Sequence, residues 1–203
     1  GNSESIIADE LMEHLLGILH IQLEERALCC CLNTLMYCTK KKNYGLFQKA
    51  LKSTKLPVIK TVLKIALNSE SNTQLYAIQT ILNISQNDDE KILLDEKYIN
   101  DIFSLIELDT IDENLREKLM LIIESIAYDA CSTKMIKSYE IIEVFRLHFL
   151  EEMYDDASFL IRSHIASIFA NLLEKRSFKE VILNEINILD IFLPLIQTSN
   201  SNF

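Results

Sequence analysis

The sequence of 203 residues contains no tryptophan, only three glycines and only two prolines. Sandwiches and barrels need many tight turns, so this shortage of chain breakers favours an all-helical protein. No apolar run approaches the roughly eighteen residues that cross a membrane, and no secretory signal peptide is visible. Apolar residues make up 49% of the chain, enough to bury a sizeable core. Gly1 stands where a start methionine would be, so we expect a fragment of a longer protein.

Cysteine is present five times, at Cys29, Cys30, Cys31, Cys38 and Cys131. Three adjacent cysteines fit neither a disulfide framework nor the spacing of a zinc site, and no histidine completes a site with Cys29 and Cys38. We therefore expect free thiols that act as small apolar residues in a reducing compartment, the cytoplasm or the nucleus. No metal ion or cofactor is predicted.

The formal charge of −10 is unevenly distributed. Residues 1–25 carry −6, residues 26–69 carry nine Lys or Arg and no Asp or Glu, and residues 70–203 carry −13. The basic block could face an acidic protein patch, nucleic acid or anionic lipid. A solvated surface that offsets the acidic remainder is the simplest interpretation, and nucleic acid is disfavoured because the whole chain would be repelled by phosphate.

A polar residue recurs within apolar helical stretches. The segments ALCCCLNT, AIQTILNIS, LMLIIESIA and IASIFANLL place Asn33, Asn83, Ser125 and Asn171 at matching positions, separated by 50, 42 and 46 residues. An acid-apolar-Phe element follows three of these residues after 18, 18 and 19 positions, at Asp101, Glu143 and Asp190. Two markers that keep the same spacing indicate an internal repeat.

Each repeat is expected to contain three helices. Long helices are predicted at 72–86 and 113–128, short ones at 90–95 and 134–138, and one with the acid-apolar-Phe element at 98–108. Ser71 or Asn72 and Asp112 have the side chains of helix starts. The first helix is predicted at 5–20, and the segment 40–45 is expected to be an inserted loop.

The pattern A-x-x-x-x-L-N-(L/I) at the end of a long helix, with a period of about forty residues, resembles the armadillo repeat. The resemblance covers nearly the whole chain and implies a right-handed α-solenoid of about four repeats, with the related HEAT repeat as the alternative subclass. The expected organisation is one domain, 1–203, with units at 5–39, 44–87, 88–130 and 131–176 and a partial unit at 177–200.

In peptide-binding members of this family, the Asn of the third helix binds the main chain of an extended partner. The resemblance implies this role for Asn33, Asn83 and Asn171, while Ser125 is too short to reach as far. An amide side chain both donates and accepts, so a column of amides can hold a peptide backbone. Each Asn could equally cap its helix or bridge to the neighbouring repeat.

Neighbours on the same helical face lie four and seven residues before each Asn or Ser. Four before are Cys29, Gln79, Leu121 and Ser167, where importin-type relatives have tryptophan, so recognition of nuclear-localisation signals is not expected. Seven before are Arg26, Tyr76, Lys118 and His164. This second row favours an acidic or phosphorylated segment over a basic one, although a solvated polar row is the simpler alternative.

No catalytic motif is present in the sequence, and its four histidines are scattered. We therefore expect a non-catalytic scaffold or adaptor that binds a protein or peptide. Two alternatives remain open. One is a co-factor that releases nucleotide from a heat-shock chaperone. The other is a self-assembly or docking module of a larger protein.

Overall fold

The computed structural model describes residues 2–88, 92–106, 108 and 111–129, together with a few positions between 163 and 179. All regular secondary structure in this part of the chain is helical, as the composition predicts. The chain divides into two compact units, Gly1–Leu119 and Met120–Phe203, which are described separately. Most of the elements predicted after residue 130 lie outside the described residues.

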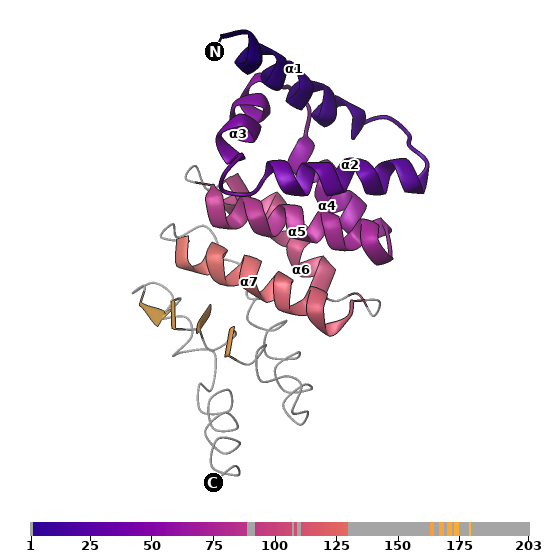
Figure 1. Ribbon diagram of the computed structural model, residues 1–203. Coiled ribbons are helices and arrows are strands. Elements are labelled where there is room, and N and C mark those ends of the chain that lie inside the picture. The colour runs from indigo at the N-terminus through magenta and orange to yellow at the C-terminus, as the bar shows by residue number, and fades with distance from the viewer. Residues whose placement is uncertain are drawn as a thin grey trace. The chain divides into compact units, whose positions relative to one another are not determined.

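The described elements are, in chain order, α1 (Asn2–Ile18), α2 (Glu25–Cys38), α3 (Tyr44–Ser53), α4 (Val58–Asn68), α5 (Ser71–Asn87), the 3-10 helix η1 (Ile92–Leu94), α6 (Glu96–Ile106) and α7 (Glu113–Asp129) (Figure 1). The bounds of α5 and α7 differ by no more than one residue from the predicted long helices. Helix α6 begins two residues before its prediction, and a 3-10 turn takes the place of the predicted short helix 90–95.

Helix α4 shows how the sequence positions a buried face. Its buried residues repeat at helical spacing: Val58, Ile59, Val62, Leu63 and Ala66. They form one apolar stripe, while the polar residues between them face outward. Pro57 precedes the first turn, where its missing N–H is not needed.

Helix α5 is buried over most of its circumference because it packs against both α2 and α4. A two-residue connection joins it to α4, and Ser71 at its start has a φ of 54°. This left-handed conformation is uncommon for a residue other than glycine. The sharp reversal that it creates brings Gln74 of α5 close to the end of α4, where Gln74 Nε2 donates to Ala66 O at 3.0 Å.

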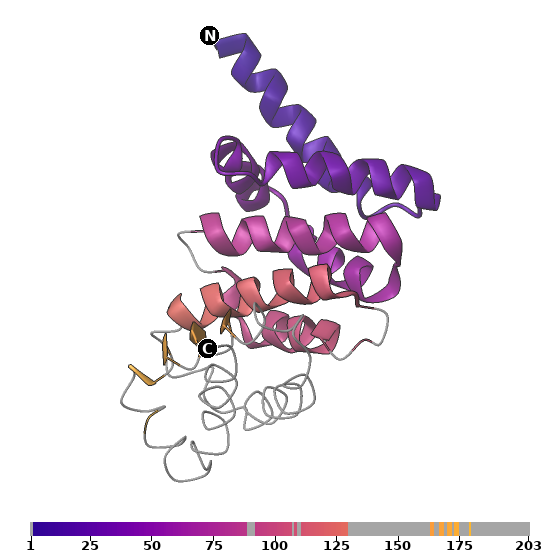
Figure 2. The same cartoon turned by 60° about the horizontal axis from the view of Figure 1, so that its bottom comes forward.

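Helices α2 and α5 run in the same direction and lie side by side (Figures 1 and 2). At their beginnings, Thr73 Oγ1 donates to Glu25 Oε1, 48 residues away. At their ends, Asn87 Nδ2 donates to Thr39 O, again 48 residues away. A constant sequence separation along two helices means that they are parallel and in fixed register.

The same regularity joins α1 to α3. Lys49 of α3 pairs with Asp9 of α1, and Ser53 Oγ donates to Glu13 Oε1, and both separations are 40 residues. The side-chain bonds of these two helix pairs thus join residues 40 and 48 positions apart. These separations are close to the predicted repeat spacings of 42 to 50 residues.

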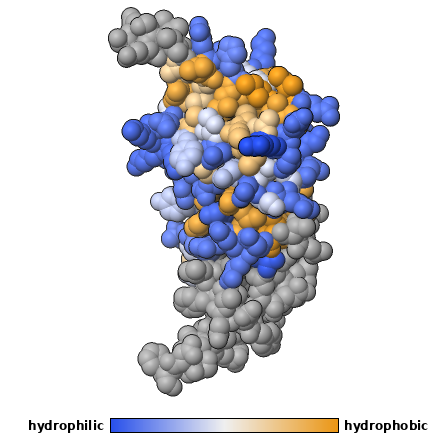
Figure 3. Space-filling model, turned by 45° about the vertical axis from the view of Figure 1, so that its right-hand side comes forward, coloured by the Kyte–Doolittle hydropathy of each residue, from blue (hydrophilic) through white to orange (hydrophobic). Residues whose placement is uncertain are grey.

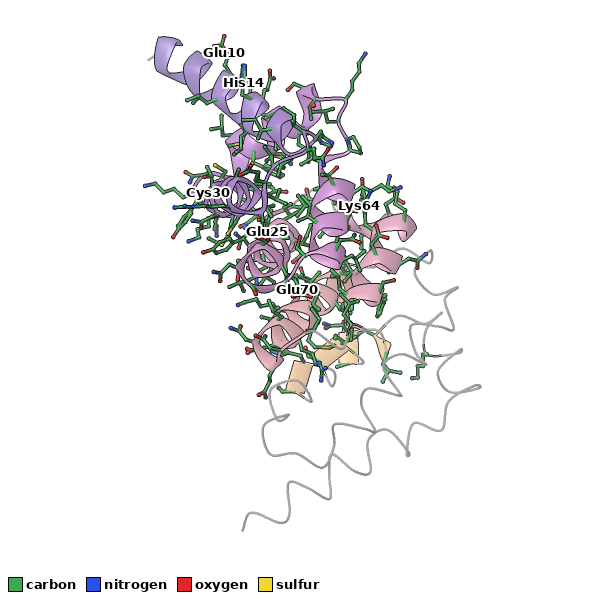
Figure 4. The ribbon with its side chains drawn as sticks, turned by 90° about the vertical axis from the view of Figure 1, so that its right-hand side faces the viewer. Glu10, His14, Glu25, Cys30, Lys64 and Glu70 are labelled. Carbon is green, nitrogen blue, oxygen red and sulfur yellow. The ribbon has the colours of Figure 1, made fainter. Side chains whose placement is uncertain are left out.

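A second layer lies behind α5. Helix α4 packs against α5 and also against α6, which carries the buried residues Ile99, Ile102 and Phe103. In Figure 4, α2 and α5 are seen nearly end-on, with α4 and its labelled Lys64 on the side away from Cys30 of α2. The apolar core of this unit therefore lies between the layer of α2 and α5 and the layer of α4 and α6. Within the described residues, no helix has both the length and the apolarity to cross a membrane.

Candidate interaction surface

The outward stripes of α2 and α5 form the candidate surface, which we call the α2/α5 face. Its residues are Arg26, Cys30, Asn33 and Tyr37 on α2, and Asn72, Tyr76, Gln79 and Gln86 on α5. Spacings of three, four and seven residues place each set on a single side of its helix. That side is opposite the buried residues of the same helix, such as Leu32 and Leu35 of α2.

Four predicted site residues lie on the α2/α5 face. Arg26 is exposed, while Asn33, Tyr76 and Gln79 are half-buried. Because α2 and α5 pack side by side, the structure brings together residues from two predicted repeats. The sequence predicts this proximity for Arg26 and Tyr76. The arrangement offers a cation, amides and an aromatic ring, which are suited to binding rather than to covalent chemistry.

Of the roles that the sequence left open for Asn83, the hydrogen bonds of the structure show a bridge within the chain and not a contact with a partner. Asn83 lies in line with Tyr76 and Gln79, but it is only 7% exposed. Its Nδ2 donates to Met36 O at 2.9 Å and to Thr39 Oγ1 at 3.2 Å, and its Oδ1 accepts from Gln79 Nε2 at 3.2 Å. Both amide hydrogens are used within the chain, so Asn83 bridges α5 to the end of α2 and does not face a partner's main chain.

Two residues that the sequence analysis did not single out complete this bridge. Thr39 is fully buried, and its hydroxyl donates to Met36 O at 3.0 Å. Asn87, one turn after Asn83, donates to Asn83 O at 2.7 Å as well as to Thr39 O. The last carbonyls of a helix lack internal donors, so these amides satisfy groups that would otherwise need water. In the sequence, the four-residue spacing that places Asn83 and Asn87 on the same side of α5 is the feature that indicates this bridge.

The remaining predicted residues lie on α7 or in the second unit, which is described by itself. Lys118 is half-buried on α7, and Ser125, His164 and Asn171 belong to the second unit. Within that unit, His164 Nδ1 lies 2.8 Å from Glu124 Oε2, and Ser167 Oγ donates to Glu124 Oε1. Glu124 therefore occupies the side chains of both His164 and Ser167.

The turn after α2 presents lysine side chains next to an aromatic ring. Tyr37 is 53% exposed, and Lys40 Nζ lies 4.1 Å from the centre of its ring. Lys41 and Lys42 are also exposed. A cation over a ring face is favourable, so Lys40 and Tyr37 hold each other in place. The predicted inserted loop is therefore a compact turn with three ammonium groups.

A polar hollow of about 420 Å³ lies within the first unit where α5 and α7 begin. Glu70, Asn72, Gln74 and Asp112 are among its lining residues. Asp112 caps α7 as predicted, because its Oδ1 accepts from Leu115 N at 2.8 Å. Glu70, by contrast, makes no side-chain cap at the start of α5.

The described thiols are free, and no group of three or more candidate metal ligands occurs in this part of the chain. Cys30 is exposed, whereas burial raises the pKa of the Cys31 and Cys38 thiols. A raised pKa lowers the fraction of reactive thiolate at neutral pH. Cys31 therefore behaves as a core residue, and its Sγ points to Leu15 O at 3.9 Å.

Helix α1 exposes apolar side chains. Leu11 and Ile18, two turns apart, are 66% and 40% exposed, and Ile21 in the following loop is 62% exposed. Figure 3 shows hydrophobic areas among hydrophilic side chains on the upper part of the face in view. Three large exposed apolar residues on or beside one helix favour contact with another surface.

No protein-family model matches the sequence, and the searches of curated proteins and of solved structures found no similar protein.

Proposed function

We propose that this chain is a non-catalytic interaction module whose α2/α5 face binds an extended segment of a partner protein. In this proposal the helices belong to a right-handed α-solenoid of about four armadillo-like repeats, and α2 and α5 are the third helices of consecutive repeats. Stacked repeats expose a continuous surface along equivalent helices, and such surfaces bind extended segments.

The observation that supports this proposal best is the sequence offset between the packed parallel helices α2 and α5. Side-chain hydrogen bonds between α2 and α5 join residues 44 to 48 positions apart, and those between α1 and α3 join residues 40 apart. Any two parallel helices keep a fixed offset, but in stacked repeats the offset between equivalent helices must also approach the repeat period, and that of α2 and α5 is close to the 50 residues between Asn33 and Asn83.

The binding residues in this proposal are Arg26, Asn33, Tyr76 and Gln79. Arg26 donates to carbonyl or carboxylate oxygens, Tyr76 packs against apolar side chains, and the two amides bind the partner's main chain. Asn83 supports them from below, because its Oδ1 accepts from Gln79 and its Nδ2 fixes α2. The contributions of Lys118, Ser125, His164 and Asn171 remain part of the proposal for the neighbouring repeats.

The test is a selection of displayed random 16-residue peptides on the purified protein, followed by affinity measurements with the variant R26A/Y76A. We expect selected peptides whose affinity falls about tenfold in this variant, because Arg and Tyr frequently dominate interfaces. The control variant K60A/K64A changes two exposed residues on α4, in the other layer, and should bind normally. Failure to select any peptide, or equal losses in both variants, would contradict the proposal.

The exposed apolar residues of α1 favour a second candidate function, self-association through this helix. Leu11, Ile18 and Ile21 would then be covered by a second copy of the chain. Sedimentation equilibrium over a concentration series tests this directly. The expected result is a dimer that the variant L11E/I18E converts to monomer, and a monomer at all concentrations would exclude it.

A further inference from the structure

The turn that follows α2 is the most one-sided charged feature of the described chain. We define the lysine turn as residues Tyr37–Asn43. Its three lysines, Lys40, Lys41 and Lys42, are exposed, and the sequence has no Asp or Glu from Arg26 to Ser69. The chain as a whole carries −10, so this turn differs in charge from most of the molecule.

The lysine turn is held in a fixed shape. Asn43 Nδ2 donates to Tyr37 O at 3.1 Å, and the backbone N–H of Asn43 donates to Lys40 O at 2.8 Å. On the other side, Thr39 is fully buried; its Oγ1 accepts a hydrogen bond from Asn83 Nδ2, and its backbone O accepts one from Asn87 Nδ2. A site that is already ordered loses little conformational entropy when a partner binds.

The cations of the lysine turn are not neutralised by the described carboxylates. Between described side chains, Lys49 forms an ion pair with Asp9 and Lys97 forms one with Asp95. Lys40 contacts the Tyr37 ring, and no ion pair with a described carboxylate involves Lys41 or Lys42. These ammonium groups are therefore open to an external anion.

The opposite end of the α2/α5 face has the opposite charge. Glu25 begins α2, and Glu70 immediately precedes α5 (Figure 4). The fourteen residues of α2 separate this end from the lysine turn by about 20 Å, at 1.5 Å per residue. Asp88, at the end of α5 near the lysine turn, is only 7% exposed and its carboxylate accepts from Ile92 N. The exposed charges of the described residues are therefore basic at this end and, although Arg26 lies beside Glu25, mainly acidic at the other, so the face can distinguish the two directions of a bound segment.

We infer that the lysine turn binds an acidic stretch of the partner segment and thereby fixes the direction in which that segment crosses the α2/α5 face. This inference rests on the proposed function. Carboxylate side chains of the partner accept charge-assisted hydrogen bonds from Lys40, Lys41 and Lys42, while Tyr37 packs against their aliphatic parts. Asn83 and Asn87 act as positioning residues, since they hold Thr39 at the base of the turn.

An acidic protein segment fits the charge distribution better than a nucleic acid does. A nucleic acid continues its charge along its whole length, with one phosphate charge per about 1.7 Å of duplex. It would meet Glu25 and Glu70 at the acidic end of the same face. A short acidic stretch of a protein can contact the lysine turn alone and continue as neutral or basic residues.

The experiment uses the peptides selected on the full chain and two variants with equal changes of charge. K40Q/K41Q/K42Q removes the lysines of the turn, and K55Q/K60Q/K64Q removes three exposed lysines near and on α4. We expect the selected peptides to carry an acidic stretch and to bind the first variant at least about tenfold more weakly. The second variant should lose less than about twofold, and raising the salt should remove the difference.

Circular dichroism melting of both variants shows that they fold, which exposed glutamines are expected to allow. Peptides without acidic enrichment that still depend on Arg26 and Tyr76 would overturn the lysine-turn inference and leave the proposed function intact. Equal losses in the two lysine variants would also overturn it. A single-stranded oligonucleotide or phosphatidylserine vesicles that bind more tightly than every selected peptide, through the same lysines, would replace the acidic segment with another class of partner.

Discussion

At the scale of single residues, Asn83 decides how the candidate surface is interpreted. Its position in an apolar helix suggested a contact with a partner, but its amide is occupied by Met36 O, Thr39 Oγ1 and Gln79. A buried amide in a chain of hydrogen bonds fixes the relative position of two helices. Its effect on binding is then indirect, through the lysine turn and Gln79.

The variant N83A should lower the free energy of unfolding by about 1–3 kcal/mol, because it removes the two buried hydrogen bonds that the Asn83 amide donates to Met36 O and Thr39 Oγ1. The matched control is N33A, an Asn→Ala change at a half-buried position of α2. Both variants gain the same helix propensity, and N33A should stay within about 0.5 kcal/mol of the original chain. Urea denaturation measures both, and equal destabilisation would contradict the bridging role of Asn83.

Thiol reactivity gives a second prediction at this scale. Cys30 is exposed, whereas the pKa of Cys31 is raised by burial, so less of Cys31 is thiolate at pH 7.5. Alkylation of the folded protein should modify Cys30 at least about tenfold faster than Cys31. The rate at Cys31 should rise as the pH increases toward its raised pKa. Mass spectrometry of the fragmented peptide distinguishes the two, and equal rates would show that α2 is not packed as described.

At the scale of elements, the helices could largely be predicted from the sequence, while their contacts could not. The apolar period of 71–87 and of 113–129 determines a long helix by local rules, and both bounds are recovered to within one residue. The acceptor of the Asn83 amide lies 47 residues away, at Met36. Local periodicity does not specify which distant carbonyl a side chain reaches. The sequence therefore left two roles for Asn83, a contact with a partner's main chain or a bridge within the chain.

The start of α7 provides a test of a single element. Asp112 accepts from Leu115 N, so D112A should lower the free energy of unfolding by about 1 kcal/mol. D112N keeps the oxygen acceptor and removes only the charge, and it should lose less than D112A does. The measurement is again urea denaturation. If D112N is as destabilised as D112A, the stabilisation by Asp112 comes mainly from its negative charge at the start of α7 and not from the hydrogen bond to Leu115 N.

At the scale of the whole molecule, the sequence predicts an all-helical protein, and the described residues agree. Composition alone suffices for this conclusion, since a chain with three glycines and two prolines cannot make many tight turns. The candidate surface was only partly predictable. Arg26, Asn33, Tyr76 and Gln79 follow from helical spacing, but the burial of Asn83 follows from the packing of α5 against α2.

The lysine turn shows why a charge pattern in sequence is incomplete. The basic block from Arg26 to Ser69 is obvious as a composition, yet its lysines face different parts of the first unit. Lys40, Lys41 and Lys42 extend the α2/α5 face, while Lys64 lies on α4 in the other layer. Only the packing of helices separates these groups, and it makes the second group a control for the first.

The most direct test of the proposed face is a nuclear magnetic resonance titration of the isotope-labelled full chain with the tightest selected peptide. The proposal predicts that amide resonances of Arg26–Tyr37 and Tyr76–Gln79 shift most, followed by those of the lysine turn. Resonances of the outer side of α4, at Lys60 and Lys64, should remain unchanged. Shifts confined to α4 or to α1, with none along α2 and α5, would contradict the proposal that this face binds the partner.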